Sequence, residues 1–151
     1  MPIKGISAGG LIAIAVIGLF LTVLTSGLLT TSQTVPTAGT VTAINVGVYN
    51  DLAFTQNCTS INWGTLSPGG QTTKTVYIKN TGTVPATLSM TTANWAPSDA
   101  SAHLSLSWNR ADYVLGVGAS VPAVLTLTVS SNIDSITSFS FNIVITGTQQ
   151  T

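Results

Sequence analysis

The feature that most constrains this chain is an apolar run near its N-terminus, from Ile6 to Leu29, with the sequence ISAGGLIAIAVIGLFLTVLTSGLL. As a helix, these 24 residues would be about 36 Å long, which is enough to cross a hydrocarbon core of about 30 Å. Thirteen of them are Leu, Ile, Val or Phe, and the helix would be apolar on every side rather than on one face. We therefore expect residues 6–33 to form a hydrophobic helix that inserts into a membrane.

Beyond this run the sequence changes to a β pattern. Residues 34–39 are hydroxyl-rich and contain Pro36 and Gly39, so we expect a linker there. From residue 40 to residue 151, apolar side chains recur at every second position in several stretches, and Gly- and Pro-containing turn signals separate the stretches. The pattern predicts an all-β, immunoglobulin-like antiparallel sandwich of about seven strands. The stretches that carry it are Thr40–Tyr49, Ser60–Leu66, Val76–Ile78, Leu88–Met90, Leu104–Trp108, Ala123–Val129 and Phe139–Ile145.

The few charges indicate a topology and exclude one class of partner. Lys4 is the only charged residue before Asp51, so the positive-inside rule places the N-terminus in the cytoplasm and the sandwich outside the cell. Only 5% of residues are charged, whereas 41 are Ser or Thr, so hydroxyl groups supply the polarity of the surface. The net charge is zero and the cations are scattered, which argues against a nucleic-acid partner.

The residues that carry most enzyme chemistry are scarce. The chain has one Cys, one His, four Asp and no Glu, and it contains no G-x-S-x-G nucleophile elbow. A single Cys allows neither an internal disulfide nor a Cys-based zinc site. We expect His103 at the start of the strand that ends at Trp108. We therefore expect no enzyme activity, no metal site and no cofactor. The Asp residues, which are all expected in turns, are Asp51, Asp99, Asp112 and Asp134.

The first six residues, Met1-Pro2-Ile3-Lys4-Gly5-Ile6, resemble a class III signal peptide, the leader of archaeal type IV pilins and related surface filaments. In such leaders a basic residue followed by Gly or Ala precedes the hydrophobic helix. By position, residues 1–5 would be the leader, and a prepilin peptidase would cut between Gly5 and Ile6. Residues 7–10 lack the Glu that bacterial pilins carry near the mature N-terminus, so the resemblance is to the archaeal type.

This resemblance implies a structural role. Archaeal pilins of this group join one hydrophobic helix to a β-sandwich. They are inserted in the membrane as precursors, and dedicated machinery assembles identical subunits into an extracellular helical filament. Gly18 and Thr22 form a small-xxx-small pair, which lets helix backbones approach closely in a filament core. The alternative is a lipid-facing anchor in which these two residues are incidental.

A second resemblance supports a different kind of fibre. Residues 78–86, Ile-Lys-Asn-Thr-Gly-Thr-Val-Pro-Ala, are similar to a turn in surface immunoglobulin-like domains, including fibre subunits of the TasA and camelysin type. Those subunits are joined by donor-strand complementation. In that alternative, Thr40–Tyr49 is the strand lent to a neighbour and the helix is a discarded signal sequence. A third alternative is a membrane-anchored extracellular domain that binds a ligand or a sugar.

Five further residues are candidates for modification, cross-linking or sugar binding. Asn57-Cys58-Thr59 is the chain's one N-x-[ST] sequon, so Asn57 is a candidate for N-glycosylation, with an unmodified loop as the alternative. Cys58 is expected to be a small buried side chain, with a cross-link between subunits as the alternative. Trp108 is expected in the core, whereas Trp63 and Trp95 are either core residues or part of a carbohydrate-binding platform.

Overall fold

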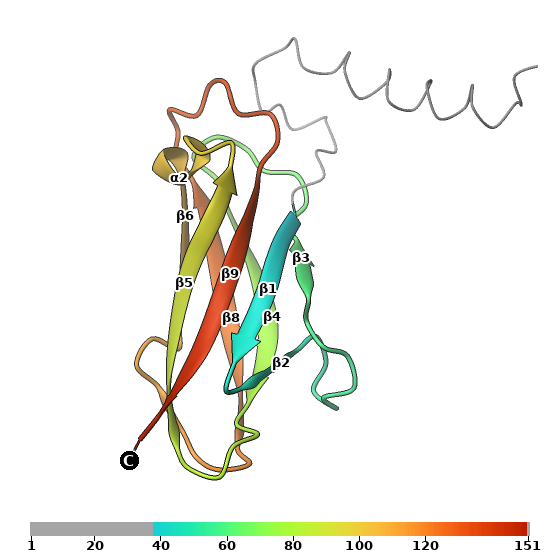
Figure 1. Cartoon of the computed structure of the whole chain (residues 1–151). Helices are drawn as coiled ribbons and strands as arrows, with labels where there is room; N and C mark the ends of the chain where they lie inside the picture. The colour runs from blue at the N-terminus through green and yellow to red at the C-terminus, as the bar shows by residue number, and fades with distance from the viewer. Residues whose placement is uncertain (1–37, 151) are drawn as a thin grey trace, which may run out of the picture.

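The computed structural model describes residues 38–150, which form two β-sheets packed around a shared core (Figure 1). This architecture confirms the predicted all-β sandwich. The expected leader, the hydrophobic helix and residues 34–37 of the expected linker lie outside the described residues.

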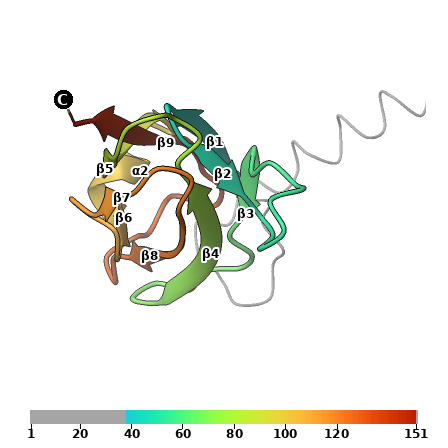
Figure 2. The ribbon, with the colours of Figure 1, turned by 90° about the horizontal axis from the view of Figure 1, so that it is seen from below.

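The larger sheet has five strands in the order β3-β1-β9-β5-β7, and the smaller has four in the order β2-β4-β8-β6. Seen along the strands, the sheets form two curved layers (Figure 2), and α2 (Ala100–His103) lies at one end, between β5 and β6 (Figure 1). The larger sheet contains β1 (Ala38–Ile44), β3 (Ser60–Asn62), β5 (Ala86–Ala96), β7 (Val114–Leu115) and β9 (Ser140–Gln149). The smaller sheet contains β2 (Gly47–Tyr49), β4 (Gln71–Lys79), β6 (Leu104–Trp108) and β8 (Ser120–Val129).

Several predicted strand boundaries change. The described residues contain nine strands, because the expected strand Thr40–Tyr49 is two strands and because β7 is too short to show a period. Asn45, at φ 61°, lies in the left-handed region between β1 and β2, where the chain passes from the larger sheet to the smaller. The strand predicted over Ser60–Leu66 ends at Asn62. β1 begins at Ala38, inside the expected linker.

One pairing corrects the expectation of a wholly antiparallel sandwich. β1 pairs with β9 in parallel over its whole length, from Ala38 beside Ser140 to Ile44 beside Thr146. On its other side β1 pairs antiparallel with β3. Hydrophobic periodicity reports which face of a strand is buried but not the direction of the strand beside it, so the sequence could not predict this pairing. As a result, the first described strand is an interior strand of its sheet.

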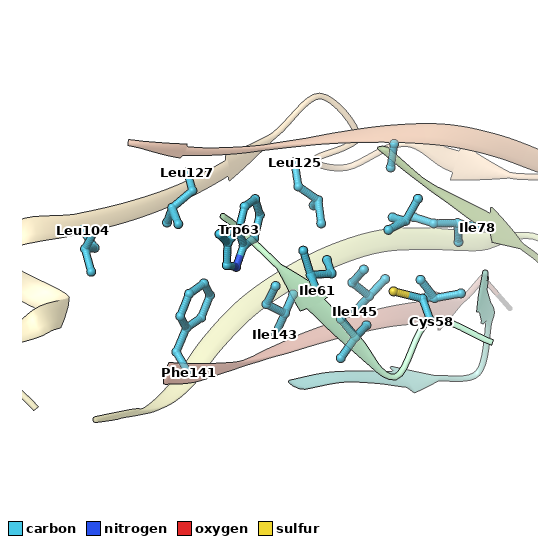
Figure 3. Close-up of a cluster of buried hydrophobic side chains, with 14 of the residues drawn as sticks. Cys58, Ile61, Trp63, Ile78, Leu104, Leu125, Leu127, Phe141, Ile143 and Ile145 are labelled. Atoms are coloured by element: carbon cyan, nitrogen blue, oxygen red, sulfur yellow. The ribbon is translucent and has the colours of Figure 1, made fainter. Parts of the chain in front are cut away.

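The core follows the predicted alternation closely. Of the eleven side chains expected to point inward from three strands, nine are buried, and side chains from both sheets point toward one another (Figure 3). The other two, Leu106 and Trp108, are only partly buried because β6 is an edge strand. Full burial of a large apolar side chain contributes roughly 1.5–3 kcal/mol. The nine are Leu104, Ala123, Leu125, Leu127, Val129, Phe139, Phe141, Ile143 and Ile145.

The core contains a stack of aromatic rings centred on Phe141. Trp63 is buried and lies parallel to Phe141, with ring centroids 6.3 Å apart, and Trp95 stacks on the same Phe141 ring at 4.1 Å. The Trp63 indole Nε1 is the one buried side-chain nitrogen or oxygen in residues 38–150 without a hydrogen-bond partner. Gly39 lies beside it, and a Cβ there would be 3.3 Å from Nε1. Trp63 is therefore a core residue, and the three Trp side chains do not form a shared surface platform.

Candidate functional site

The residues predicted to direct processing and helix packing lie outside the described part of the chain. Lys4, Gly5 and Ile6 at the expected cleavage site, and Gly18 and Thr22 in the expected helix, all precede residue 38. Their roles stay predictions. Within residues 38–150, no helix is long and apolar enough to cross a membrane.

The titratable residues of the sandwich are dispersed. Residues 38–150 contain no group of three His, Cys, Asp or Glu side chains that could hold a metal ion. His103 is partly buried at the end of α2, one residue before the strand it was expected to open, and its carbonyl accepts a hydrogen bond from the Ser130 amide. Asp99 and Asp112 lie in turns as expected, and Asp134 lies in the loop that precedes β9.

The sequon lies on an ordered segment between β2 and β3. Asn57 forms a bridge with Tyr49, and the Cys58 amide donates to the Val48 carbonyl over 2.8 Å. This backbone leaves Asn57 and Thr59 exposed and turns the Cys58 side chain into the core. The expectation that Cys58 is a buried small residue is confirmed, and burial raises the pKa of its thiol. Asn57 is accessible to a modifying enzyme.

A loop over residues 50–57 projects beside the sequon and is fixed by Asp51. The Asp51 carboxylate accepts hydrogen bonds from the Thr55 hydroxyl and from the amides of Thr55 and Gln56. These bonds, with the Thr55 hydroxyl first, lower the pKa of Asp51. At the loop's base, Phe54 packs edge-on against Tyr49, and the Lys79 Nζ lies 4.9 Å from the Phe54 ring centroid.

One flank of the sandwich is open between β3 and β4. β2 pairs only with the last three residues of β4, so no strand of the described chain lies beside Gln71–Thr75 on that side. The result is a groove of about 230 Å³ that we call the β3–β4 groove. Ser60–Asn62 form one wall, Lys74–Val76 form the other, and Asn50 also lines it. The sandwich is therefore incompletely closed along this flank.

The opposite flank is also open, and it is uncharged along its strands. β7 pairs with only the first two residues of β5, and β6 pairs with β8 alone. Neither β5 nor β6 contains a charged residue, although charges are a common device for protecting strand edges. Beside these strands Tyr113, Val114 and Val117 are 40%, 49% and 55% exposed. We call these three residues the β7 patch.

Comparison with known proteins assigns no family. No protein-family model matches the chain, and no curated protein matches it. Its function is therefore inferred from its own segment order, charges and surfaces.

Proposed function

We propose that the chain is the structural subunit of an archaeal type IV pilus-like filament. Residues 6–33 form the helix that is stored in the membrane and then packed into the filament core, and the immunoglobulin-like sandwich forms the outer surface. The observation that carries this proposal is the junction Lys4-Gly5-Ile6, where a short basic leader meets a long apolar run. A helix that is apolar on every side suits both lipid and a bundle of identical helices.

The way the sandwich begins supports a permanent attachment to this helix. The chain enters the described domain at Ala38, at the start of β1, which is paired on both sides, with β3 and with β9. A force transmitted from the helix would therefore act on a strand with two rows of hydrogen bonds. Such a domain can be carried on the outside of a filament without unravelling from its first residue.

The same strand favours this proposal over the donor-strand alternative. Most of the segment that would be lent to a neighbour, Thr40–Tyr49, forms β1 and β2 within its own sandwich. Val41 is buried there, in the same core as Ile61 and Ile143. A subunit that lent β1 without receiving a neighbour's β1 would separate β3 from β9 and expose this apolar surface, at a cost of about 25 cal/mol for each Å².

The proposed location and partners follow from the same order of segments. The precursor spans the membrane with its sandwich outside the cell, a prepilin peptidase removes residues 1–5, and the assembly machinery adds the subunit to a homopolymer. Asn57 is exposed on the sandwich and is the proposed site of N-glycosylation. The chain carries no nucleotide-binding motif, so the energy for assembly comes from the machinery.

A processing variant tests this proposal in cells that make the filament. Gly5→Trp places a bulky residue at the cleavage junction, so we expect uncut precursor to accumulate in the membrane and extracellular filaments to disappear from electron micrographs. Gly10→Ala, five residues farther along, is the matched control and should leave processing intact. Filaments of normal abundance from Gly5→Trp would contradict the proposal. Wild-type cells with processed subunits but no filaments would favour the anchored binding domain.

A further inference from the structure

We propose that neighbouring sandwiches bind each other head to tail, with the β7 patch of one copy seated in the β3–β4 groove of a second copy and Asp112 paired with Lys74. This inference rests on the proposed function in one respect, because a filament brings identical sandwiches next to each other. It adds a contact surface outside the helical core and names the residues on both of its sides.

The acceptor side is a strand position beside β4 that residues 38–150 leave vacant. β2 runs beside β4 as far as the pair Tyr49 and Tyr77, and the chain then departs into the loop over residues 50–57. The N–H and C=O groups of successive residues in a strand point alternately to its two sides. Those of Tyr77 point toward β2, so those of Thr75 and Thr73 point to the same side, where no strand of the described chain lies. An open strand edge of this kind is a template for pairing with another chain.

Lys74 gives the groove its charge. Lys74 lies on the same face of β4 as the buried residues Val76 and Ile78. It is nevertheless exposed, because the sandwich is open at this point. Its ammonium group makes no ion pair, hydrogen bond or ring contact within residues 38–150. The groove therefore offers an unpaired cation beside an open strand edge, which suits an extended segment that carries one acidic side chain.

The β7 patch offers what the β3–β4 groove lacks, which is exposed apolar surface next to an unpaired carboxylate. Tyr113, Val114 and Val117 expose apolar surface, and Asp112 stands next to them with its carboxylate free of any partner in the described chain. Asp112 is held at φ 57° by the turn, and its amide donates to the Leu88 carbonyl over 3.0 Å, so its position is fixed. Arg110 is already engaged, since its Nε donates to the Pro122 carbonyl and its guanidinium lies over the Tyr113 ring.

Among the charged residues of the described chain, one cation and one anion suit this contact best. Asp99 and Asp134 are also exposed, but neither is next in sequence to an exposed large apolar residue. Among the cations of residues 38–150, Lys79 contacts Phe54 and Arg110 contacts Tyr113, so Lys74 is the one without a contact. Among the anions, Asp51 is bonded within its own loop. Asp112 is the free carboxylate that adjoins exposed apolar residues. A second copy of this chain thus supplies both the charge and the apolar surface that the groove lacks, and opposite charges at such a contact fix its register.

Because the two surfaces lie at different places on the sandwich, the contact can be repeated from copy to copy and does not end in a closed dimer. Figure 2 shows β7 and β6 on one flank and β3 on the other. The groove also lies toward the end where β1 begins, since Ala38 pairs with Asn62, whereas Leu115 of β7 lies at the other end, beside Ala86. Two different patches on opposite flanks give a heterologous interface, which generates an open helical polymer unless the rotation happens to close a ring. Successive copies would be offset along the strand direction.

Charge reversal in the full chain tests the pairing. Lys74→Asp and Asp112→Lys each place like charges together, so we expect either variant to lower the yield of filaments at least about tenfold. The double variant restores opposite charges in swapped positions and should recover most of the yield. Asp134→Lys, which reverses another exposed carboxylate, is the matched control and should assemble normally. Loss without recovery in the double variant would overturn the proposal.

Cross-linking separates this contact from the proposed function. In the full chain carrying Lys74→Cys and Asp112→Cys, we expect a short bis-maleimide to give a ladder of covalent multimers, because a Lys–Asp pair holds its Cα atoms farther apart than a disulfide allows. Lys74→Cys with Asp134→Cys, and the wild-type chain with buried Cys58, should give no ladder. Filaments without a ladder overturn this contact alone. A ladder in detergent from a chain that never forms filaments supports the contact and overturns the proposed function.

Discussion

Truncating Val41 to Ala in the fragment 34–151 asks whether β1 belongs to its own subunit. Val41 is 7% exposed in β1 and is part of the core. Losing two buried carbon groups costs about 1.6 kcal/mol at about 0.8 kcal/mol each, and the cavity left behind raises the total to about 2–3 kcal/mol. We expect the free energy of unfolding to fall by that amount, and the melting temperature to fall by about 8–12 °C.

The assay is urea unfolding of the fragment at two protein concentrations, followed by circular dichroism. Thr40→Ala, on the exposed face of the same strand, is the control and should change the free energy of unfolding by no more than about 0.5 kcal/mol. We expect a cooperative transition whose midpoint is independent of protein concentration. If β1 were instead exchanged between subunits, the fragment would form fibres or dimers and the midpoint would depend on concentration. That result would show that β1 does not belong to its own subunit.

Three further predictions test other parts of the account. Gly39→Ala would place a Cβ 3.3 Å from the Trp63 Nε1, so the unfolding free energy should drop by about 1–3 kcal/mol, whereas Gly116→Ala, whose Cβ would meet its nearest neighbour at 3.9 Å, should be tolerated. The hydrogen bonds that lower the pKa of Asp51 in the folded state stabilise the fold fully above the unfolded pKa of about 3.9, and this contribution is lost as pH falls through the lower folded pKa. Asp51→Asn should therefore remove part of the pH dependence of stability between pH 5 and 2, and an unchanged pH profile would contradict the role assigned to this carboxylate. Gly18→Leu should still insert in the membrane but should give fewer and less heat-resistant filaments, and filaments of unchanged yield would show that close helix packing is not required there.

The sequence predicted the faces of the strands better than their number or their partners. Period-two alternation is strong in Ala123–Val129 and Phe139–Ile145, and all eight alternate residues of these two stretches are buried. It failed for β7, because two residues cannot show a period. It also failed between β1 and β2, where a positive φ at Asn45 divides one apparent strand. The parallel pairing of β1 with β9 joins residues about a hundred positions apart, and no local pattern encodes such a contact.

The surfaces proposed to bind a neighbour were the least predictable part. In the sequence, Lys74 looks like any polar residue of a strand. It becomes a candidate contact residue only because β2 pairs with β4 no further than Tyr77, which leaves the strand edge beside Lys74 open. Tyr113 and Val114 look like core residues in the sequence, and they are exposed because β7 is a short edge strand. The burial of Cys58 was predictable from its residue type alone. The exposure of Asn57 depended on how that segment is bridged to Tyr49.

The N-terminal residue of subunits isolated from extracellular filaments decides whether the helix stays with the subunit and forms the filament core. Edman sequencing or intact mass spectrometry of that material should give a chain that begins at Ile6 and continues through the whole apolar run. A chain that begins beyond Gly27 would have lost the helix. That result would contradict the pilus-like proposal and would favour a fibre built by the β domain alone.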